Sequence, residues 1–168
     1  MKIYIGTDHA GFELKEKIKA YLLEKKYEVE DCGAFEFNKA DDFPDFIGKV
    51  GQAVSKDPEN SRGIIFGGSG QAEMMLANKF KGVRCALFYV PAMPVQAVDA
   101  TGRTSDNPYE IIRLTREHNN ANILSFGARF LTEDQSKIAV ESWLEQPFPG
   151  DGRHIRRINK IKQIENQV

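Results

Sequence analysis

Two polar residues, Asp8 and His9, follow the first strand-like run of the sequence, from Lys2 to Gly6. A carboxylate beside an imidazole can bind a small polar ligand and move protons on it. Gly11 then opens a stretch in which apolar residues recur at helical spacing. The position therefore also has a plainer explanation, in which Asp8 caps the helix and His9 is a surface turn residue.

A glycine-rich loop at residues 67–70 joins an apolar run from Gly63 to Phe66 to a helix-like segment. Backbone N–H groups without side-chain bulk can point there at an anion or a developing oxyanion. The loop continues as G-x-G-x-x-E, with Glu73 in place of the last glycine of a dinucleotide fingerprint, so a nicotinamide cofactor is disfavoured. The loop also lacks the G-x-S-x-G pattern of a hydrolase nucleophile. We therefore expect Ser69 to donate hydrogen bonds.

Glu73 lies one turn into the helix expected over residues 71–79. Side chains tilt towards the N-terminus of their helix, so the Glu73 carboxylate can lean back over the glycine-rich loop and act there as a base. The alternative is an ordinary first-turn acid that complements the helix dipole.

Two further polar groups lie in the last third of the chain. His118 and Asn119 end a helix expected to begin at residues 107–108, where a histidine can also serve only the helix dipole. Arg153 and Arg157 lie one turn apart on another expected helix and could clamp a phosphate. A solvated basic helix end explains these arginines equally well.

We expect neither a metal nor a cofactor. The three histidines are His9, His118 and His154, and none has the spacing of a zinc site. A catalytic metal needs a dense set of carboxylates and imidazoles, which these positions do not supply. Cys32 and Cys85 lie far apart in strand-like runs, where a small buried hydrophobe is expected.

Strands and helices alternate along the chain and must position these residues. Strands are expected at residues 2–6, 27–32, 63–66, 83–90 and 122–126. The alternation predicts a doubly wound, Rossmann-like three-layer α/β/α sandwich around a five-stranded parallel sheet, which binds ligands beyond the carboxyl ends of its strands. Thr132 and Gln135 resemble a capping box before the helix that carries Trp143. A C-terminal helix at about 153–166 carries an apolar stripe: Ile155, Ile158, Ile161 and Ile164.

Composition limits the class of protein. A chain of 168 residues, 41% of them hydrophobic, fits one domain over residues 1–168. Lys and Arg number 23 against 24 Asp and Glu, so neither nucleic acid nor an anionic membrane is an expected partner. The N-terminal run reaches Asp8 too soon for a signal peptide or a membrane span, and the two cysteines suit a reducing compartment. We therefore expect a cytoplasmic protein.

Five ordered motifs resemble the type B ribose-5-phosphate isomerase and galactose-6-phosphate isomerase family, and together they cover most of the chain. They are Gly6-Thr7-Asp8-His9-Ala10-Gly11, Asp42-Phe43-Pro44, Gly67-Gly68-Ser69-Gly70 with Ala77-Asn78-Lys79, Arg116-Glu117-His118-Asn119, and Gly152-Arg153-His154. The resemblance implies a metal-free isomerase that interconverts ribose 5-phosphate and ribulose 5-phosphate. A base would move a proton between C1 and C2 through a cis-enediolate.

The resemblance also implies roles for the matching positions. His118 would open the sugar ring, the loop with Ser69 would hold the enediolate, and Arg153 with Arg157 would clamp the phosphate. The other substrate contacts would come from Asp8, His9, Asn119, Gly67, Gly68 and Gly70.

Many members of the family use a cysteine as the base, but Gly67 occupies that position here. A second branch has a glutamate in the following helix, and Glu73 stands in its place, so we predict Glu73 as the base. Phenylalanines replace tyrosines that are frequent near Asp42. An insertion at about 91–112 makes this connection longer than in the family, and it could form a lid, a specificity wall, a subunit contact or a surface loop.

One chain is not expected to complete the site. His118 ends a helix that returns to the amino edge of the sheet, whereas Asp8 and Glu73 lie at the carboxyl edge, roughly 17 to 20 Å away. We therefore expect a homodimer with sites shared between subunits, or a tetramer built from it, as the resemblance also implies. The rival hypotheses are an isomerase of a hexose 6-phosphate, such as allose or galactose 6-phosphate, and a non-catalytic sugar-phosphate-binding subunit.

Overall fold

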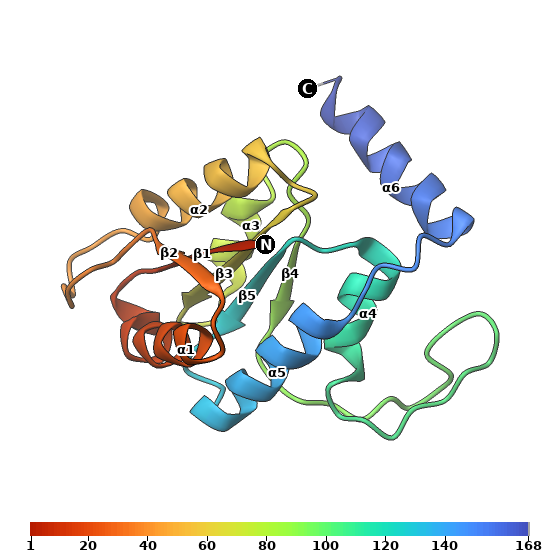
Figure 1. The fold of residues 1–168 in the computed structure, drawn as a ribbon, viewed down its shortest axis with the longest axis horizontal. Coiled ribbons are helices and arrows are strands. Elements are labelled where there is room, and N and C mark those ends of the chain that lie inside the picture. The colour runs from red at the N-terminus through yellow and green to blue at the C-terminus, as the bar shows by residue number, and fades with distance from the viewer. Residues whose placement is uncertain (168) are drawn as a thin grey trace.

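A computed structural model describes residues 1–167, which form a single parallel sheet with helices on both faces. The strand order is β2-β1-β3-β5-β4 (Figure 1). The strands are β1 (Lys2–Thr7), β2 (Glu28–Asp31), β3 (Ser61–Gly67), β4 (Cys85–Phe88) and β5 (Ile123–Gly127). The predicted doubly wound, Rossmann-like sandwich around a five-stranded sheet is confirmed.

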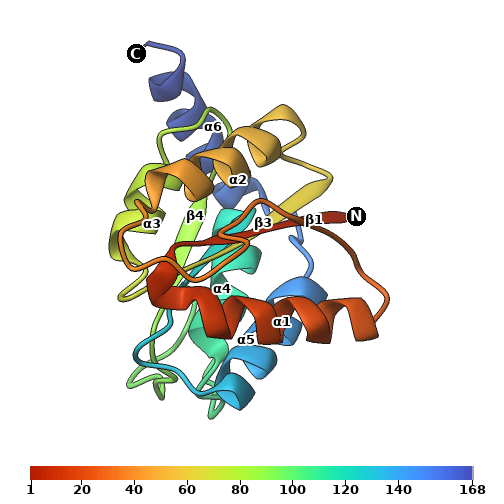
Figure 2. The same ribbon diagram turned by 90° about the vertical axis from the view of Figure 1, so that its left-hand side faces the viewer.

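Helices form the two outer layers of the sandwich. Figure 2 shows α1 and α5 on one side of the sheet, and α2 and α3 on the other. The helices are α1 (Phe12–Glu24), α2 (Pro44–Lys56), α3 (Gln71–Ala77), α4 (Glu110–Asn119), α5 (Glu133–Glu145) and α6 (Gly152–Glu165), with a 3-10 turn at His9–Gly11. The predicted capping box is present, because the Thr132 hydroxyl accepts the Gln135 N–H and the Gln135 side chain accepts the Thr132 N–H.

Two hydrophobic cores hold these layers together. Successive residues of β3 point to opposite faces, so Ile64 and Phe66 pack towards α1 and α5 with Trp143, while Ile65 packs towards α2 with Val50. All five side chains are fully buried. Burying each such side chain stabilises the fold by about 1.5 to 3 kcal/mol.

Two predicted elements differ from the structure. The run at 83–90 was expected to be a buried strand, but β4 is a four-residue edge strand whose first three residues, Cys85 included, are only half-buried. Arg84 stays outside the ladder because its N–H donates to the Asn122 side chain. The fourth helix begins at Glu110, not at residues 107–108, because the Asn107 side chain accepts the Tyr109 N–H in a turn.

The C-terminal helix α6 lies at the rim of the domain (Figures 1 and 2), where the Glu165 carboxylate accepts the Gly82 N–H at 3.2 Å. Its predicted apolar stripe is largely uncovered, since Ile155, Ile161 and Ile164 are 41 to 62% exposed. None of the helices within residues 1–167 is both long and apolar enough to cross a membrane.

Candidate active site

The carboxyl ends of β1 and β3 bring Asp8 and Glu73 together. The two strands are neighbours, with Thr7 paired to Phe66, so Asp8 emerges beside Gly67. Asp8 is 8% exposed and Glu73 is 5% exposed. Two acidic side chains are thus buried at the sheet edge where folds of this class bind ligands.

The Glu73 carboxylate leans back over the end of β3, as the tilt of helical side chains predicts. A Cβ atom built on Gly67 would overlap this carboxylate. Helix α3 begins directly after Gly70, which has a φ of +72° and lies against the backbone of Phe126. Only glycine adopts that conformation without strain, so the loop sequence fixes the start of the helix and hence the position of Glu73.

Burial raises the pKa of Glu73, and the negative charge of Asp8 raises it further. A raised pKa makes the ionised carboxylate a stronger base than a solvated glutamate. The arrangement can therefore accept a proton from a weakly acidic carbon.

The glycine-rich loop presents backbone donors at the same edge. Among residues 1–167, no protein acceptor is found for the N–H groups of Ser69 and Gly70. The Ser125 hydroxyl donates a 2.7 Å hydrogen bond to the Gly70 carbonyl and so fixes the loop from below. These two N–H groups are thus available to an anion at this edge of the sheet.

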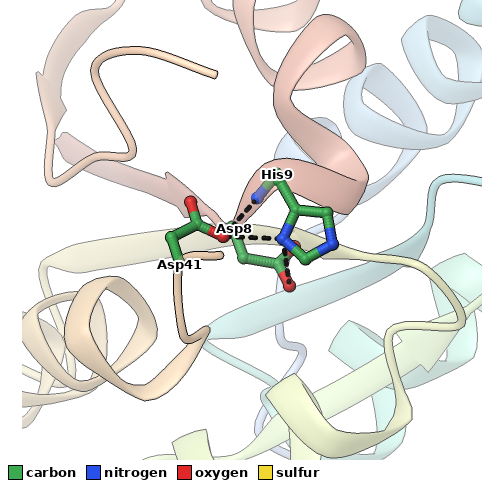
Figure 3. A group of neighbouring side chains, drawn as sticks. All are labelled: Asp8, His9 and Asp41. Carbon is green, nitrogen blue, oxygen red and sulfur yellow. Dashed lines mark hydrogen bonds and ion pairs between the residues drawn. The ribbon is translucent and has the colours of Figure 1, made fainter. Parts of the chain in front are cut away.

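Asp8 and His9 lie beside Asp41 (Figure 3). The Asp8 side chain accepts the Ala10 N–H at 3.0 Å, so it caps the 3-10 turn as well as lining the edge of the sheet. His9 Nδ1 lies 2.6 Å from Asp41 Oδ1 and 3.8 Å from Asp8 Oδ2.

These three side chains could hold a metal ion by composition, since their ligand atoms lie within 4.8 Å of one another. However, the two closest atoms, His9 Nδ1 and Asp41 Oδ1, are hydrogen-bonded to each other. Asp41 Oδ1 also accepts a hydrogen bond from the backbone N–H of His9 at 3.0 Å. Hydrogen bonds within the group account for its geometry. A cation would have to break them.

Arg129 is a site candidate that the sequence motifs do not predict. Arg129 lies two residues after β5. Its guanidinium is close to Gly68, because a Cβ atom built on Gly68 would lie 3.3 Å from it. With His9, Lys17 and Lys39, it lines a cavity of about 680 Å³. Residues that directly follow a parallel strand lie at the carboxyl edge of the sheet, as Asp8 does. The position of Arg129 just after β5 was therefore the sequence signal that could have predicted it.

His118 and Asn119 lie at the opposite edge of the sheet. They end α4 four residues before β5 begins, and the His118 ring stacks on the ring of His154 with centroids 4.4 Å apart. Burial lowers the pKa of His154, as do the nearby His118 and Arg153. His154 therefore favours its neutral form, in which its Nε2 accepts a 3.0 Å hydrogen bond from Arg153.

Two arginines hold the turn that follows His118. Arg84 Nε donates to the carbonyls of Asn119 and Asn120, at 3.0 Å each. The buried Arg116 donates to the Asn120 side chain and to the Ala121 carbonyl, at 2.7 Å each. Guanidinium groups thus satisfy the free carbonyls at the helix end and hold His118 in place.

The predicted site residues therefore fall into two groups. Asp8, His9, Glu73 and residues 67–70 meet at the carboxyl edge. His118, Asn119 and Arg153 lie at the amino edge, and Arg157 is an exposed residue of α6. One chain does not bring the two groups together.

The connection between β4 and α4 begins beside the glycine-rich loop. Tyr89 and Val90 share a cavity of about 380 Å³ with Ser69. Figure 1 shows the rest of the connection reaching away beside α4. Arg103 holds it there through ion pairs of 2.7 to 3.0 Å with Asp99, Glu110 and Glu117.

Fold and site together define a doubly wound α/β protein that gathers two buried carboxylates, a glycine-rich loop and the Arg129 guanidinium at one sheet edge. The family model described as Ribose/Galactose Isomerase matches residues 3–101 and 105–161, and the chain belongs to this family. The predicted resemblance is thereby confirmed.

Individual relatives match over nearly their whole length. Ribose-5-phosphate isomerase B of Mycolicibacterium paratuberculosis is 36% identical over 98% of this chain and 92% of that protein. The Escherichia coli protein of the same name is 34% identical over 99% of this chain and 97% of its own length. The crystal structure of ribose-5-phosphate isomerase B from Mycoplasma genitalium with bound ribulose-5-phosphate superimposes with a TM-score of 0.86, at 35% identity, over 99% and 97% of the two chains.

Proposed function

We propose that this protein interconverts ribose 5-phosphate and ribulose 5-phosphate, with Glu73 as the base. The observation that carries the proposal is the Glu73 carboxylate, 5% exposed, over Gly67 and beside an anion-holding loop. The names of the relatives and the ribulose-5-phosphate bound to the Mycoplasma genitalium protein support this choice of substrate.

The reaction needs a proton moved between C1 and C2 of an open-chain sugar. Ionised Glu73 takes the proton from C2 of the aldose, and the enediolate oxygen accepts hydrogen bonds from the Ser69 and Gly70 N–H groups. Protonated Glu73 then returns this proton to C1, while the hydroxyl proton on the C2 oxygen passes to the C1 oxygen and leaves the C2 carbonyl of the ketose. The same carboxylate thus serves both halves of the carbon-to-carbon proton transfer. No step requires a metal ion.

Cationic side chains hold the phosphate at the far end of the sugar. His9 and Arg129 line the 680 Å³ cavity of one chain, and Arg153 and Arg157 of a second chain complete the clamp. Asp8 and Asn119 contact the sugar hydroxyls.

A homodimer accounts for the separation of the two groups of residues. His118 opens the sugar ring, and it lies at the amino edge, so a partner chain has to bring it to Glu73. The exposed stripe on α6, at Ile155, Ile161 and Ile164, is the kind of surface that a second subunit covers.

Turnover of ribose 5-phosphate in the presence of a chelator tests the proposal. The wild-type protein should isomerise it, and Glu73→Gln should lower kcat about 100- to 10,000-fold because the amide cannot accept the proton. Allose and galactose 6-phosphates run alongside as six-carbon substrates. Absence of turnover of ribose 5-phosphate by the wild type would refute the assignment.

A further inference from the structure

The loop between β2 and α2 places Asp41 against His9, 32 residues away in the sequence (Figure 3). Asp41 Oδ1 accepts two hydrogen bonds from His9, one from the backbone N–H at 3.0 Å and one from ring Nδ1 at 2.6 Å. Only 7% of the Asp41 side chain is exposed. One carboxylate oxygen thus fixes both the backbone and the ring of His9.

This contact decides which ring atom is left for a ligand. A carboxylate oxygen has no hydrogen to donate, so ring Nδ1 must be the donor and carries a proton whether the ring is neutral or charged. The other nitrogen, Nε2, has no hydrogen-bond partner among residues 1–167, and His9 lines the 680 Å³ cavity with Lys39 and Arg129.

Stability alone does not explain the Asp41 carboxylate. Its second oxygen, Oδ2, is buried and has no hydrogen-bond partner among residues 1–167. A buried carboxylate oxygen without a partner is costly, and such groups are concentrated where function requires them.

We propose that Asp41 is a positioning residue for substrate binding, which holds the His9 imidazole with Nε2 towards the phosphorylated sugar. Asp41 itself does not touch the sugar. The proposal rests on the proposed function and adds to it a residue outside the family motifs given above.

A double-mutant cycle on the KM for ribose 5-phosphate tests the proposal. Asp41→Asn keeps the size of the side chain but removes its charge, so KM should rise about tenfold, as expected for loss of a charge-assisted hydrogen bond. Combined with His9→Gln, it should add nothing further, because the residue that it orients is gone. Asp45→Asn, an exposed acid four residues along the chain, should leave KM unchanged.

The ring proton supplies a second readout that does not depend on turnover. The chain has three histidines, so a downfield Nδ1–H resonance can be assigned by its loss in His9→Gln. It should move upfield in Asp41→Asn, because a neutral amide oxygen is a weaker acceptor than a carboxylate, and it should be lost in Asp41→Ser, which is also the substitute if the amide variant does not fold. An unchanged KM in Asp41→Asn, or an increase that adds in full to that of His9→Gln, would overturn the proposal. If the wild type lacked isomerase activity, the proposed function would fail, while the resonance would still test the contact.

Discussion

At the scale of single residues, Gly67 and Glu73 depend on each other. The space that a Cβ atom would take on Gly67 is filled by the Glu73 carboxylate. A side chain at position 67 and a glutamate base at position 73 therefore exclude each other. This is a physical reason for a chain whose β3 ends in glycine to carry its proposed base in the following helix.

Gly67→Ala should accordingly displace Glu73 and abolish most turnover. We expect kcat to fall at least about 100-fold, because misplacing a base by 1 Å has effects of this size. Gly48→Ala is the matched control, since a Cβ there meets only the Phe80 ring at 4.0 Å, and it should leave kcat unchanged. Steady-state kinetics compare the two, and wild-type turnover in Gly67→Ala would show that the base is not Glu73.

Ionised Glu73 should also lower the stability of the folded protein at neutral pH. Burial raises its pKa in the folded state, so the folded protein favours the protonated form and is destabilised once the group ionises. Glu73→Gln should therefore raise the free energy of unfolding at pH 8, by about 1.4 kcal/mol for each unit of pKa increase, and the gain should vanish below the ordinary carboxyl pKa.

Urea unfolding of both proteins from pH 4 to pH 8 measures this difference. Glu145→Gln replaces an exposed acid and serves as the control. A Glu73→Gln variant less stable than the wild type at pH 8 would contradict a desolvated carboxylate.

The sequence predicted the position of Glu73 because a helical tilt and a preceding glycine loop act locally. Asp41 and Arg129 were not predicted. Asp41 reaches His9 from a loop 32 residues away, and no local pattern encodes that contact. Arg129 lies just after β5, where the sheet-edge rule applies but no motif marks it.

At the scale of elements, the connection between β4 and α4 depends on one arginine. Arg103 pairs with three carboxylates, and the Glu110 side chain among them is only 1% exposed. Without Arg103, the nearest cation to the Glu110 carboxylate would be Arg113, which lies farther away, at 3.8 Å instead of 2.7 Å.

Arg103→Met should therefore destabilise the protein by about 3 kcal/mol and expose the connection to proteases. Lys137→Met breaks a helix pair whose carboxylate, Glu133, is 37% exposed and stays solvated, so it should cost less than about 1 kcal/mol. Adding Glu110→Gln to Arg103→Met should recover most of the loss. Equal costs for Arg103→Met and Lys137→Met, measured by urea unfolding, would count against the buried pair.

The alternation of strands and helices could be predicted because the central strands β1, β3 and β5 are short, mainly apolar segments followed by glycine or polar residues. The edge strand β4 was predicted too long, since an apolar run does not reveal where its ladder ends. The first residue of β4 is set by Arg84, whose backbone N–H donates to the side chain of Asn122, 38 residues away in the sequence.

At the scale of the whole molecule, two groups of predicted site residues lie at opposite edges of the sheet. We therefore proposed that a site is built from two chains, in which Glu73 of one chain works with His118 of its partner. Subunit complementation tests it most directly. Glu73→Gln and His118→Ala should each be nearly inactive as homodimers.

Unfolding and refolding an equimolar mixture of the two variants should restore about a quarter of wild-type activity, because half of the dimers are mixed and each mixed dimer keeps one intact site. If the mixture showed only the summed activity of its parents, although mixed dimers had formed, Glu73 and His118 would not share a site across the interface.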